Sequence, residues 1–556
     1  MSRSVQQACA LLDGLIGSGC RWLVLSPGSR NAPLILAAAR AEAAGWVKTL
    51  VRLDERSAGF AALGLILAGV GPVALICTSG TAAANYHPAV LEAAHSALPL
   101  LVITADRPAA LQRVGANQTT NQVGLFAPVV LRELFPKQTW PPEDWQLTGR
   151  QAIAAAVGAR SGQAGPVHIN VPLADPLVPK PGWLAATNLG PTQAVSPVSP
   201  PVSPPAQASQ LLALELEFGP RTVVVAGAGA GPAARQLAEV AGWPLLAEPE
   251  SGSWGGPNVI SAGRLLVARH RLAKQIERLV VFGRPVLTRP ITQLVQRSDL
   301  TVIGVHPGAG QWFDQGRAAR VLASEVRLAG LPGPAELTWL GQWQKAGQAA
   351  WQAASCYLQS QPLSGPLVAA TVAEACAGSP LLVGASSALR DLDLTPATGG
   401  PVYSLRGLAG IDGTVSAASG LALGLARPVM ALLGDLTLLH DAGGLALGVL
   451  EAEFDLTLVV LNDRGGAIFE GLEVGRPDLR PVFERYMATE QAVDLAALAQ
   501  AYGWGHKRVG DLGQLDQALA RPPVGRRLVE VVLDRSGRAN LEAQLAGLLD
   551  QPPAAG

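Results

Sequence analysis

The chain alternates short, uninterrupted apolar runs with segments of helical length that are rich in alanine and other small residues. Residues 21–175 contain the runs WLVLS, TLVRL, PVALICT, LPLLVIT and PVHINV. The theme returns as TVVVAGAG, RLVVFG and LTVIGV within 211–331, and as PLLVGAS, PVMALLGD, LTLVVLND and RLVEVVLD after residue 363. Apolar strands without polar alternation, separated by helices, are typical of parallel sheets covered on both faces. The pattern therefore predicts an α/β protein with three open parallel-sheet domains.

The length and one proline-rich stretch set the predicted domain boundaries. A chain of 556 residues is too long for a single hydrophobic core. The stretch PTQAVSPVSPPVSPPAQ, residues 191–207, cannot form a regular helix or sheet and predicts an extended tether. We expect a first domain over 1–185, a linker over 186–207, a middle domain over 208–345 and a third domain over 346–556.

Composition narrows the class of protein. Hydrophobic residues make up 49% and charged residues only 15%, which predicts large buried surfaces within or between chains. The net charge of zero gives no reason to expect a nucleic-acid or anionic-membrane partner. Apolar runs are broken by glycine and proline and are too short to span a bilayer, so we expect no membrane insertion. Five cysteines without metal-binding spacing favour reduced thiols in the cytoplasm.

The polar residues that directly follow the apolar runs are the candidates for function. In parallel α/β sheets, ligands bind beyond the carboxyl ends of the strands and near the following helix N-termini. The positions concerned are Ser29-Arg30, Asp54-Glu55, Thr78-Ser79-Gly80, Asp106-Arg107, Gly434-Asp435 and Asn462-Asp463.

One stretch predicts a divalent metal. In GDLTLLHDAGGLALGVLEAEFDLTLVVLNDRGG, residues 434–466, two successive apolar runs each end in a carboxylate, Asp435 and Asp463. Carboxylate, amide and carbonyl oxygens suit Mg²⁺, which is usually shared with a phosphate. Each half alone is better explained as a helix N-cap or a turn. The two halves together are more specific, and they resemble the signature of thiamine diphosphate enzymes.

That resemblance implies a set of ligands. It places the metal, Mg²⁺ or Mn²⁺, on Asp435, Asp463 and the carbonyl of Gly465, and leaves Asn462 as the less expected ligand. The sequence departs from the signature at two positions. Leu436 stands where the family has a third glycine, and Asp463 stands where it has asparagine.

A thiamine enzyme also needs a carboxylate on the aminopyrimidine ring of its cofactor, held in a low-dielectric pocket. Glu55, in TLVRLDERSAGFAALG, follows an apolar strand and begins a helix of small residues. Taken alone, Glu55 is better explained as a surface residue that favours the helix dipole. The metal signature in the third domain reverses that preference, so we predict that Glu55 is catalytic.

A narrower resemblance covers the first and third domains. The strings SPGSRNAPL, DERSAGFAALG, TSGTAAANYHPAVLEA, TADRPAAL, GANQTTNQ, LRGLAGIDG and NDRGGAIFEGL resemble, in order, the 2-succinyl-5-enolpyruvyl-6-hydroxy-3-cyclohexene-1-carboxylate synthase (MenD) family. The resemblance implies pyrimidine-binding, central Rossmann-like and diphosphate-binding domains, and a transferase of menaquinone or phylloquinone biosynthesis. Enzymes of this family join the succinyl-semialdehyde unit of 2-oxoglutarate, after loss of CO₂, to isochorismate by 1,4-addition.

The same resemblance implies the residues of the site. Both substrates are dicarboxylates, which arginine recognises best. The implied substrate-binding residues are Ser29, Arg30, Arg107, Asn117, Gln118, Arg289, Ser386, Arg390 and Arg406, with Ile468, Phe469 and Leu472 as an apolar wall. The implied cofactor-binding residues are Glu55, Thr78, Ser79, Gly80, Ile411, Gly434, Asp435, Leu436, Asn462, Gly466 and Ile468. Ile411 corresponds to the bulky residue that supports the bent cofactor. The family's NSxPxR string is present here as Ala385 to Arg390, without its asparagine and proline.

Oligomerisation and rival functions complete the expectations. In the superfamily the cofactor bridges the first domain of one subunit and the third domain of another, which implies a homodimer or homotetramer with its active site at the subunit interface.

An acetohydroxyacid synthase-like enzyme or a simple 2-oxoacid decarboxylase would share Glu55 and the metal signature but needs fewer arginines. An NAD(P)-dependent oxidoreductase would use VVVAGAGAGPAARQLAE, where Pro232 replaces the last glycine of the dinucleotide fingerprint. An inactive scaffold would not need Glu55 and Asp435.

Overall fold

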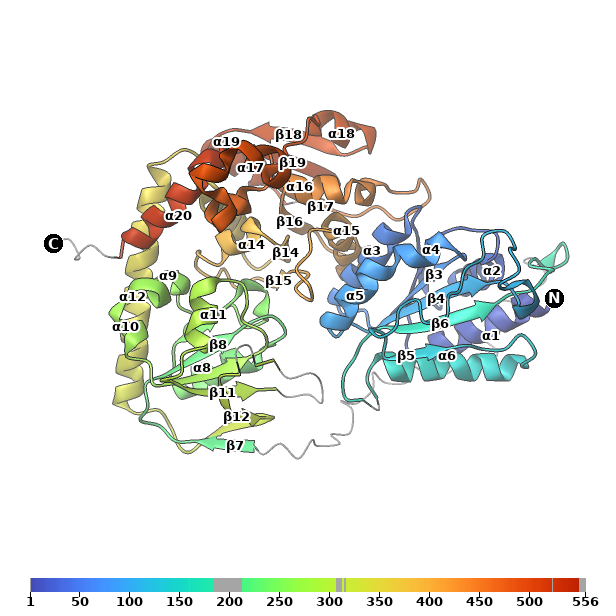
Figure 1. The fold of residues 1–556 in the computed structure, drawn as a ribbon, viewed down its shortest axis with the longest axis horizontal. Coiled ribbons are helices and arrows are strands. Elements are labelled where there is room, and N and C mark those ends of the chain that lie inside the picture. The colour runs from blue at the N-terminus through green and yellow to red at the C-terminus, as the bar shows by residue number, and fades with distance from the viewer. Residues whose placement is uncertain are drawn as a thin grey trace. The chain divides into compact units, whose positions relative to one another are not determined.

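The computed structural model describes residues 2–159, 161–183, 213–306, 313–314, 317–522 and 524–549 (Figure 1). The predicted linker over 186–207 lies outside the described residues. Within them, three parallel sheets follow one another along the chain, as the apolar runs predict. No helix in these ranges is long and apolar enough to cross a membrane.

The first sheet has six parallel strands in the order β2-β1-β3-β4-β6-β5. The strands are β1 (Trp22–Leu25), β2 (Lys48–Val51), β3 (Val73–Cys77), β4 (Leu100–Asp106), β5 (Arg132–Leu134) and β6 (Val167–Pro172). The helices are α1 (Arg3–Gly17), α2 (Ala32–Ala43), α3 (Glu55–Leu67), α4 (Thr81–Asn85), α5 (His87–His95) and α6 (Pro142–Ala156). Every residue of β3 and β4 is buried, because helices cover both faces of the sheet.

The middle sheet has five parallel strands in the order β12-β11-β10-β8-β9. They are β8 (Thr222–Ala226), β9 (Leu245–Ala247), β10 (Arg278–Phe282), β11 (Thr301–Val305) and β12 (Ala319–Ala323), and β7 (Ala213–Leu216) pairs separately with β13 (Glu325–Leu328). The helices are α8 (Ala233–Ala241), α9 (Gly263–Arg269), α10 (Arg271–Lys274), α11 (Arg289–Val295) and α12 (Pro334–Gln359).

The third sheet has six parallel strands in the order β15-β14-β16-β17-β19-β18. They are β14 (Leu381–Val383), β15 (Val402–Tyr403), β16 (Val429–Gly434), β17 (Leu456–Asn462), β18 (Gly505–Val509) and β19 (Arg526–Val532). The α-helices are α13 (Gly365–Ala375), α14 (Ser387–Leu392), α15 (Thr414–Leu425), α16 (Asp435–His440), α17 (Arg480–Phe483), α18 (Leu495–Ala501), α19 (Leu512–Leu519) and α20 (Arg538–Gly547). Both six-stranded sheets run second, first, third, fourth, sixth, fifth, so they share one topology.

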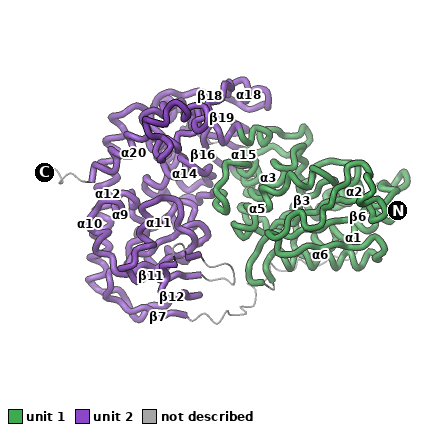
Figure 2. The backbone as a smooth tube through the Cα atoms, in the orientation of Figure 1, with its two compact units in different colours: residues 1–208, 405–427, 440–455 green, residues 209–404, 428–439, 456–556 purple. Residues whose placement is uncertain are grey.

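The contacts within the chain divide it into two compact units (Figure 2). One unit takes in 1–208, 405–427 and 440–455, and the other takes in 209–404, 428–439 and 456–556. The predicted domains follow the three sheets, and the predicted boundary at 345 falls inside α12. The three-domain division stays a proposal about how the chain is organised.

Two helices of the first unit, α3 and α15, pack through small residues. A Cβ added at Gly420 would lie 2.0 Å from the carbonyl oxygen of Ala61. A Cβ added at Gly64 would lie 2.0 Å from the carbonyl oxygen of Ala417. Because the opposing atoms are backbone, neither helix can move a side chain aside to make room. The small residues after Glu55 therefore serve a close approach of two helices.

Gly420→Ala is expected to destabilise the protein by about 1–3 kcal/mol, the usual cost of overpacking a tight contact. The measurement is the midpoint of urea unfolding, compared with wild type. Gly341→Ala is the matched control, since Gly341 lies on an exposed face of α12 with nothing near its missing Cβ. That control should raise stability by about 0.5–1 kcal/mol, through helix propensity alone. Equal effects of the two substitutions would contradict the close-packing interpretation.

Candidate functional site

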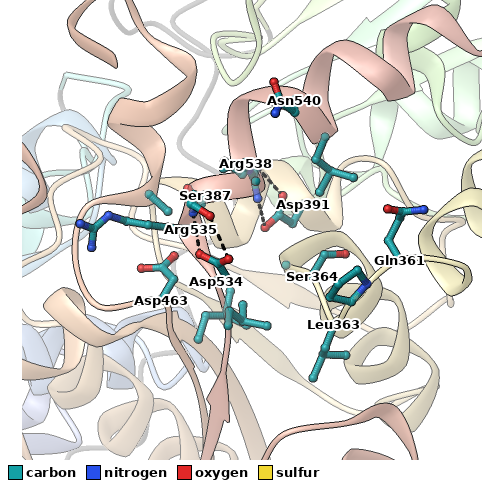
Figure 3. Close-up of a pocket in the computed structure, with 18 of the residues that line it drawn as sticks. Gln361, Leu363, Ser364, Ser387, Asp391, Asp463, Asp534, Arg535, Arg538 and Asn540 are labelled. Atoms are coloured by element: carbon teal, nitrogen blue, oxygen red, sulfur yellow. Dashed lines mark hydrogen bonds and ion pairs between the residues drawn. The ribbon is translucent and has the colours of Figure 1, made fainter. Parts of the chain in front are cut away.

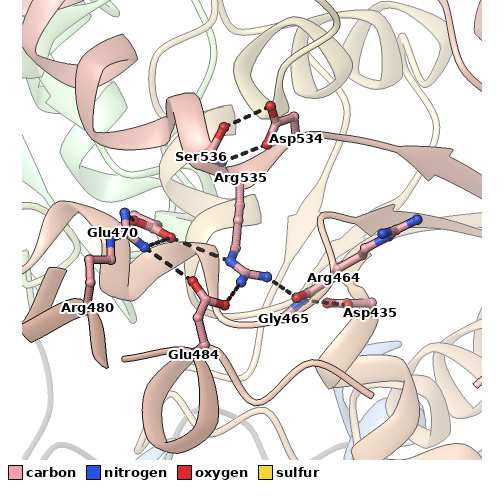
Figure 4. A network of polar contacts seen from close by, with 9 residues as sticks. All are labelled: Asp435, Arg464, Gly465, Glu470, Arg480, Glu484, Asp534, Arg535 and Ser536. Atoms are coloured by element: carbon pink, nitrogen blue, oxygen red, sulfur yellow. Dashed lines mark hydrogen bonds and ion pairs between the residues drawn. The ribbon is translucent and has the colours of Figure 1, made fainter. Parts of the chain in front are cut away.

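Two neighbouring strands deliver the predicted metal ligands to one edge of the third sheet. Strands β16 and β17 are parallel, with Gly434 paired to Leu461, so Asp435 and the loop after Asn462 lie at the same end. Asp435 is only 6% exposed. Its carboxylate accepts hydrogen bonds from the N–H of Leu436 at 2.8 Å and from the N–H of Gly465 at 2.9 Å (Figure 4). The structure thus brings Asp435 and the predicted ligand loop together.

The two carboxylates of this edge lie close enough for their charges to interact, with Asp435 buried and Asp463 half-buried. Burial raises the pKa of Asp435 to about 6. Burial, reinforced by the negative charge of Asp435, raises the pKa of Asp463 to about 8. One oxygen of Asp463, Oδ1, is buried and has no hydrogen-bond partner within the described residues. Two interacting carboxylates, one with a buried and unsatisfied oxygen, fit a divalent cation, which would compensate both charges.

Asn462 has partners elsewhere in the sheet. Its Nδ2 donates to Oε1 of Glu530 on β19 at 2.7 Å, and its Oδ1 accepts from the N–H of Arg464 at 3.3 Å. These bonds leave Asp463 as the better candidate for the second side-chain ligand. No group of three or more His, Cys, Asp or Glu side chains that could hold a metal is present among the described residues. Further ligands would then come from the Gly465 carbonyl, water or phosphate oxygens.

The ligand loop needs glycine at position 465. Gly465 has φ +130°, and a Cβ there would lie 2.3 Å from the carbonyl oxygen of Ala488. The neighbouring N–H of Gly466 donates to the same oxygen at 2.8 Å. On the other strand, Gly434 ends β16 and Leu436 is half-buried in the first turn of α16. The N–H of Gly465, which donates to Asp435, therefore depends on a backbone conformation that residues other than glycine rarely adopt.

An arginine that the sequence patterns do not single out holds this loop through a backbone carbonyl. Arg535 donates to the carbonyl of Arg464 and pairs with Glu484, and its Nε lies 3.5 Å from Oε1 of Glu470 (Figure 4). Glu470 in turn pairs with Arg480 at 2.6 Å. Arg535 lies after the last strand, β19, so a pattern of strand ends could have marked its position but not its role. It acts as a support for the predicted metal loop.

Arg535→Gln is expected to weaken metal and cofactor binding about 10- to 100-fold, the usual effect of removing a group that orients a metal ligand. The reason is that the Arg464 carbonyl would lose its donor and the loop its fixed position. The measurement is the Mg²⁺ concentration for half-maximal activity at saturating thiamine diphosphate. Arg476→Gln is the control, because Arg476 pairs with Asp478 on the surface, where such pairs contribute little. An unchanged Mg²⁺ requirement in Arg535→Gln would refute the supporting role.

A cavity of about 360 Å³ in the second unit collects four of the predicted substrate residues. These are Arg289, Arg390, Ile468 and Leu472. Ser386 lies beside them with φ +80°, and its carbonyl accepts a hydrogen bond from Nη1 of Arg390 at 2.9 Å. Phe469, in the 3₁₀ helix Ala467–Gly471, does not line this cavity and lies against Gly466 instead. The arrangement gives a basic site with an apolar side, as a dicarboxylate with a carbon skeleton requires.

A second cavity, of about 310 Å³, has Asp463 in its lining (Figure 3). Asp391 and Arg538 form a two-pronged ion pair in its wall, with N–O distances of 2.9 and 2.6 Å. The carboxylate of Asp534, on the same wall, accepts hydrogen bonds from the N–H and the hydroxyl of Ser536. Ser387 and Arg538 line both cavities, so the start of α20 and the start of α14 form the shared wall.

Glu55 is the first residue of α3 in the first unit. The preceding Asp54 is the N-cap, and its Oδ1 accepts the N–H of Arg56 at 2.9 Å. Glu55 is half-buried, and burial followed by the charge of Asp54 raises the pKa of its carboxyl. The charge of Glu55 also contributes to the raised pKa of two buried groups, Cys77 and Tyr86, whose main cause is their own burial. Glu55 thus has the environment that favours a protonated or strongly hydrogen-bonded carboxyl.

The strand ends of the first sheet bring three more predicted residues together. Nη1 of Arg107 donates to the hydroxyl of Ser79 and to the carbonyl of Gln118. Nε2 of Gln118 donates back to the carbonyl of Ser79 at 3.0 Å. The N–H of Gly80 donates to Gln122 at 3.0 Å, the last residue of GANQTTNQ, to which the sequence assigned no role. Only the folded loop shows that Gln122 belongs to this cluster.

Arg30 adds a second positive charge near Arg107. Burial, and then the charge of Arg30, lowers the pKa of Arg107. Arg30 donates to the carbonyl of Leu173 at 2.9 Å and lies 3.5 Å from Oδ2 of Asp175. Two neighbouring guanidinium groups are costly to hold together unless an anion shares them. The pair therefore fits a carboxylate ligand.

The remaining predicted residues are more scattered. In the described part of the chain, the exposed side chains of Ser29 and Asn117 make no hydrogen bond. Thr78 is buried against Gly28. Arg406 is buried at the start of a loop that Glu92 holds through the N–H groups of Gly407 and Leu408, and Ile411 is half-buried further along it. The roles of all these residues stay predictions.

Comparison with known proteins agrees with this geometry. Residues 6–125 match the family model "Thiamine pyrophosphate enzyme, N-terminal TPP binding domain", and residues 398–529 match its C-terminal TPP binding domain counterpart. The fold is similar to that of benzoylformate decarboxylase from Polynucleobacter necessarius, with a TM-score of 0.63 at 18% identity over 96% of this chain and 99% of that one. These findings confirm the predicted fold class and the predicted thiamine diphosphate cofactor.

Closer relatives cover nearly the whole chain. The chain is 46% identical to 2-succinyl-5-enolpyruvyl-6-hydroxy-3-cyclohexene-1-carboxylate synthase of Kineococcus radiotolerans, over 96% of this chain and 97% of the relative. It is 44% identical to the enzyme of that name from Nocardioides sp. over 97% and 96%, and 40% identical to that from Rhodococcus opacus over 99% and 100%. The predicted family is therefore confirmed, and the chain belongs to the 2-succinyl-5-enolpyruvyl-6-hydroxy-3-cyclohexene-1-carboxylate synthase family of thiamine diphosphate enzymes.

Proposed function

We propose that the chain converts 2-oxoglutarate and isochorismate to 2-succinyl-5-enolpyruvyl-6-hydroxy-3-cyclohexene-1-carboxylate and CO₂, as a carboligating transferase of menaquinone or phylloquinone biosynthesis. The product is the one named for relatives that are 40–46% identical over almost the full length. The observation that carries the assignment is the cavity with Arg289 and Arg390 in the same unit as the Asp435–Asp463 pair. It combines a basic site for dicarboxylates with a site for a metal and diphosphate.

Each group of residues has a distinct task in this proposal. Asp435, Asp463 and the Gly465 carbonyl would hold Mg²⁺ or Mn²⁺, and through it the diphosphate of the cofactor. Thiamine diphosphate supplies the electron sink that a 2-oxoacid needs to lose CO₂. Glu55 holds or releases a proton at the aminopyrimidine ring, for which its raised pKa is suited. The substrate carboxylates are bound and oriented by arginines, namely Arg289, Arg390, Arg30 and Arg107.

The apolar side chains have a complementary task. Ile468 and Leu472 exclude water from one side of the cavity. A less polar wall favours loss of a charged carboxylate as neutral CO₂, because the charge is poorly solvated there. In this proposal the large side chain of Ile411 supports the bent cofactor.

The proposed assembly is a homodimer or homotetramer with its active site at the subunit interface. Its support in the structure is a group of exposed apolar side chains in the first unit. Leu53, two residues before Glu55, is 86% exposed, and Val449 and Leu450 are 99% and 95% exposed. Contiguous exposed apolar side chains usually mark surfaces that another chain covers. The proposed location is the cytoplasm, because the five cysteines are free thiols.

The test is release of CO₂ from 2-oxoglutarate by purified protein with thiamine diphosphate and Mg²⁺, with and without isochorismate. Turnover that requires isochorismate and yields the named product would support the proposal. Consumption of pyruvate with no effect of isochorismate would instead favour an acetohydroxyacid synthase or a simple decarboxylase. An isochorismate-independent change in nicotinamide absorbance would favour the oxidoreductase alternative, which the family membership does not support.

A further inference from the structure

The cavity of about 360 Å³ contains an arginine that none of the family strings includes. Arg264 lies in the first turn of α9, in the middle domain, and lines this cavity together with Arg289 and Arg390. Only 9% of Arg264 is exposed. A guanidinium group is strongly hydrated in water, so its burial is costly unless hydrogen bonds replace that hydration.

The other arginines of the cavity have protein partners. Arg538 forms the two-pronged ion pair with Asp391 and donates to Glu542 at 2.8 Å. Arg289 donates to Glu473 at 3.1 Å, and Arg390 donates to the carbonyl of Ser386. The guanidinium group of Arg264, by contrast, makes no hydrogen bond to any residue in the described ranges.

Three carboxylates nevertheless lie close enough to sense the charge of Arg264: Asp391, Asp393 and Glu542. Burial raises the pKa of Asp393 to about 6, and Arg264 opposes that rise. Burial also acts to raise the pKa of Glu542, but the charges of Arg264 and Arg538 hold it below its usual value. These carboxylates explain how a buried cation is tolerated at this position. They do not use its five N–H donors, which stay available to a ligand in the cavity.

We propose that Arg264 is a further substrate-binding residue of this enzyme, which donates its N–H groups to a carboxylate of 2-oxoglutarate or of isochorismate in the cavity that Arg289, Arg390, Ile468 and Leu472 line. The inference rests on the proposed function, because it takes the ligand to be one of the two dicarboxylate substrates. The planar guanidinium group suits this task, since it can bind both carboxylate oxygens at once.

The alternative is that Arg264 only compensates the buried charge of Asp393. The two roles predict different kinetics. A residue that binds a substrate carboxylate in both the ground state and the transition state affects KM, whereas a structural partner affects stability and lowers kcat without a selective change in KM.

The experiment measures KM for each substrate separately, at saturating concentration of the other, in wild type, Arg264→Gln and Arg264→Lys. Arg269→Gln is the matched control, because Arg269 is the exposed last residue of the same helix. In Arg264→Gln, the KM for one of the two substrates should rise about 10- to 100-fold, the range expected for a lost charge-assisted hydrogen bond, with kcat within about threefold of wild type. Arg264→Lys should recover part of the loss, because it keeps the charge but not the two-pronged geometry. The substrate whose KM rises is the ligand.

A binding measurement without turnover separates this inference from the proposed function. The probes are glutarate, which resembles 2-oxoglutarate but lacks the keto group, and chorismate, an isomer of isochorismate. Each is added to cofactor-loaded protein, and the shift in thermal midpoint is recorded. Arg264→Gln should lose the shift with one probe, and Arg269→Gln should keep both. Unchanged KM values and unchanged shifts in Arg264→Gln would overturn the inference even if the wild type is an active synthase. An Arg264-dependent shift in a protein without synthase activity would uphold the dicarboxylate site and refute the proposed function.

Discussion

Glu55→Gln is expected to lower kcat about 10²- to 10⁴-fold, the usual contribution of a general acid–base group, while the protein still binds its cofactor. Glutamine has the size of glutamate but cannot exchange a proton at the aminopyrimidine ring. The helix start remains intact, because its N-cap is Asp54 and not Glu55. The diphosphate and metal should still bind, since their predicted ligands lie in the segments around Asp435 and Gly465.

Two measurements test this expectation. The first is steady-state release of CO₂ at saturating substrates and cofactor. The second is deuterium exchange at C2 of bound thiamine diphosphate, which reports activation of the cofactor without any substrate. Glu374→Gln, an exposed carboxylate on α13, is the control and should leave both rates unchanged. If Glu55→Gln keeps kcat and the exchange rate within threefold of wild type, Glu55 is only a first-turn residue that favours the helix dipole.

The interior of the fold could be predicted from the sequence because its strands are buried on both faces. The runs VALIC and LPLLVIT became β3 and β4, and LTLVVLND became β17 with its polar end, because a central parallel strand has no solvent-facing side. Among the edge strands, β2 was marked by the run TLVRL, whereas β5 and β18 escaped the pattern. In β5, with the sequence REL, and β18, with GHKRV, exposed and buried positions are mixed and charges are frequent. Such segments pair because a neighbouring strand offers its backbone, which hydrophobic periodicity does not record.

Some residues of the candidate site could also be predicted from the sequence, and others could not. Asp435, Asp463 and Arg107 could be predicted because each directly follows a buried strand, where parallel sheets place their ligands. Arg264 could not, since it lies on helix α9 and not at a strand end, and the position of Arg535 after the last strand did not reveal its role. Their significance comes from which groups the fold places around them. Residues that contact a ligand at strand ends leave a local signature, whereas those that support or complete the site depend on tertiary contacts.

Asp435→Asn and Asp463→Asn are expected to differ in effect, although both remove one negative charge from the same edge of the sheet. Asp435→Asn should abolish most of the activity, whereas Asp463→Asn should stabilise the metal-free protein. Asp435 is fixed by two N–H groups, one of them from the opposite loop at Gly465. Its replacement puts an amide N–H₂ or a neutral oxygen where those donors and the metal need a carboxylate. We expect at least about a 100-fold loss of activity at the Mg²⁺ and cofactor concentrations that saturate wild type, beyond the effect of removing a supporting residue. The cofactor should also be lost on gel filtration in Mg²⁺.

Asp463→Asn keeps an oxygen ligand and removes the charge that Asp435 opposes. Because burial and Asp435 raise the pKa of Asp463 to about 8, its ionised form destabilises the folded protein without metal. The sign follows from linkage: the folded state holds a proton that the unfolded state releases above about pH 4, so stability falls as the pH rises from there to the folded pKa, and the full cost remains at higher pH. Asparagine removes that cost, and the metal-free protein should unfold at a temperature higher by roughly 2–4 °C per kcal/mol gained. Calorimetry of metal-free Asp463→Asn at pH 7, with activity measured beside it, tests this. A lower unfolding temperature, or cofactor loss as severe as in Asp435→Asn, would show that the second carboxylate is required as a charge and not only as a ligand oxygen.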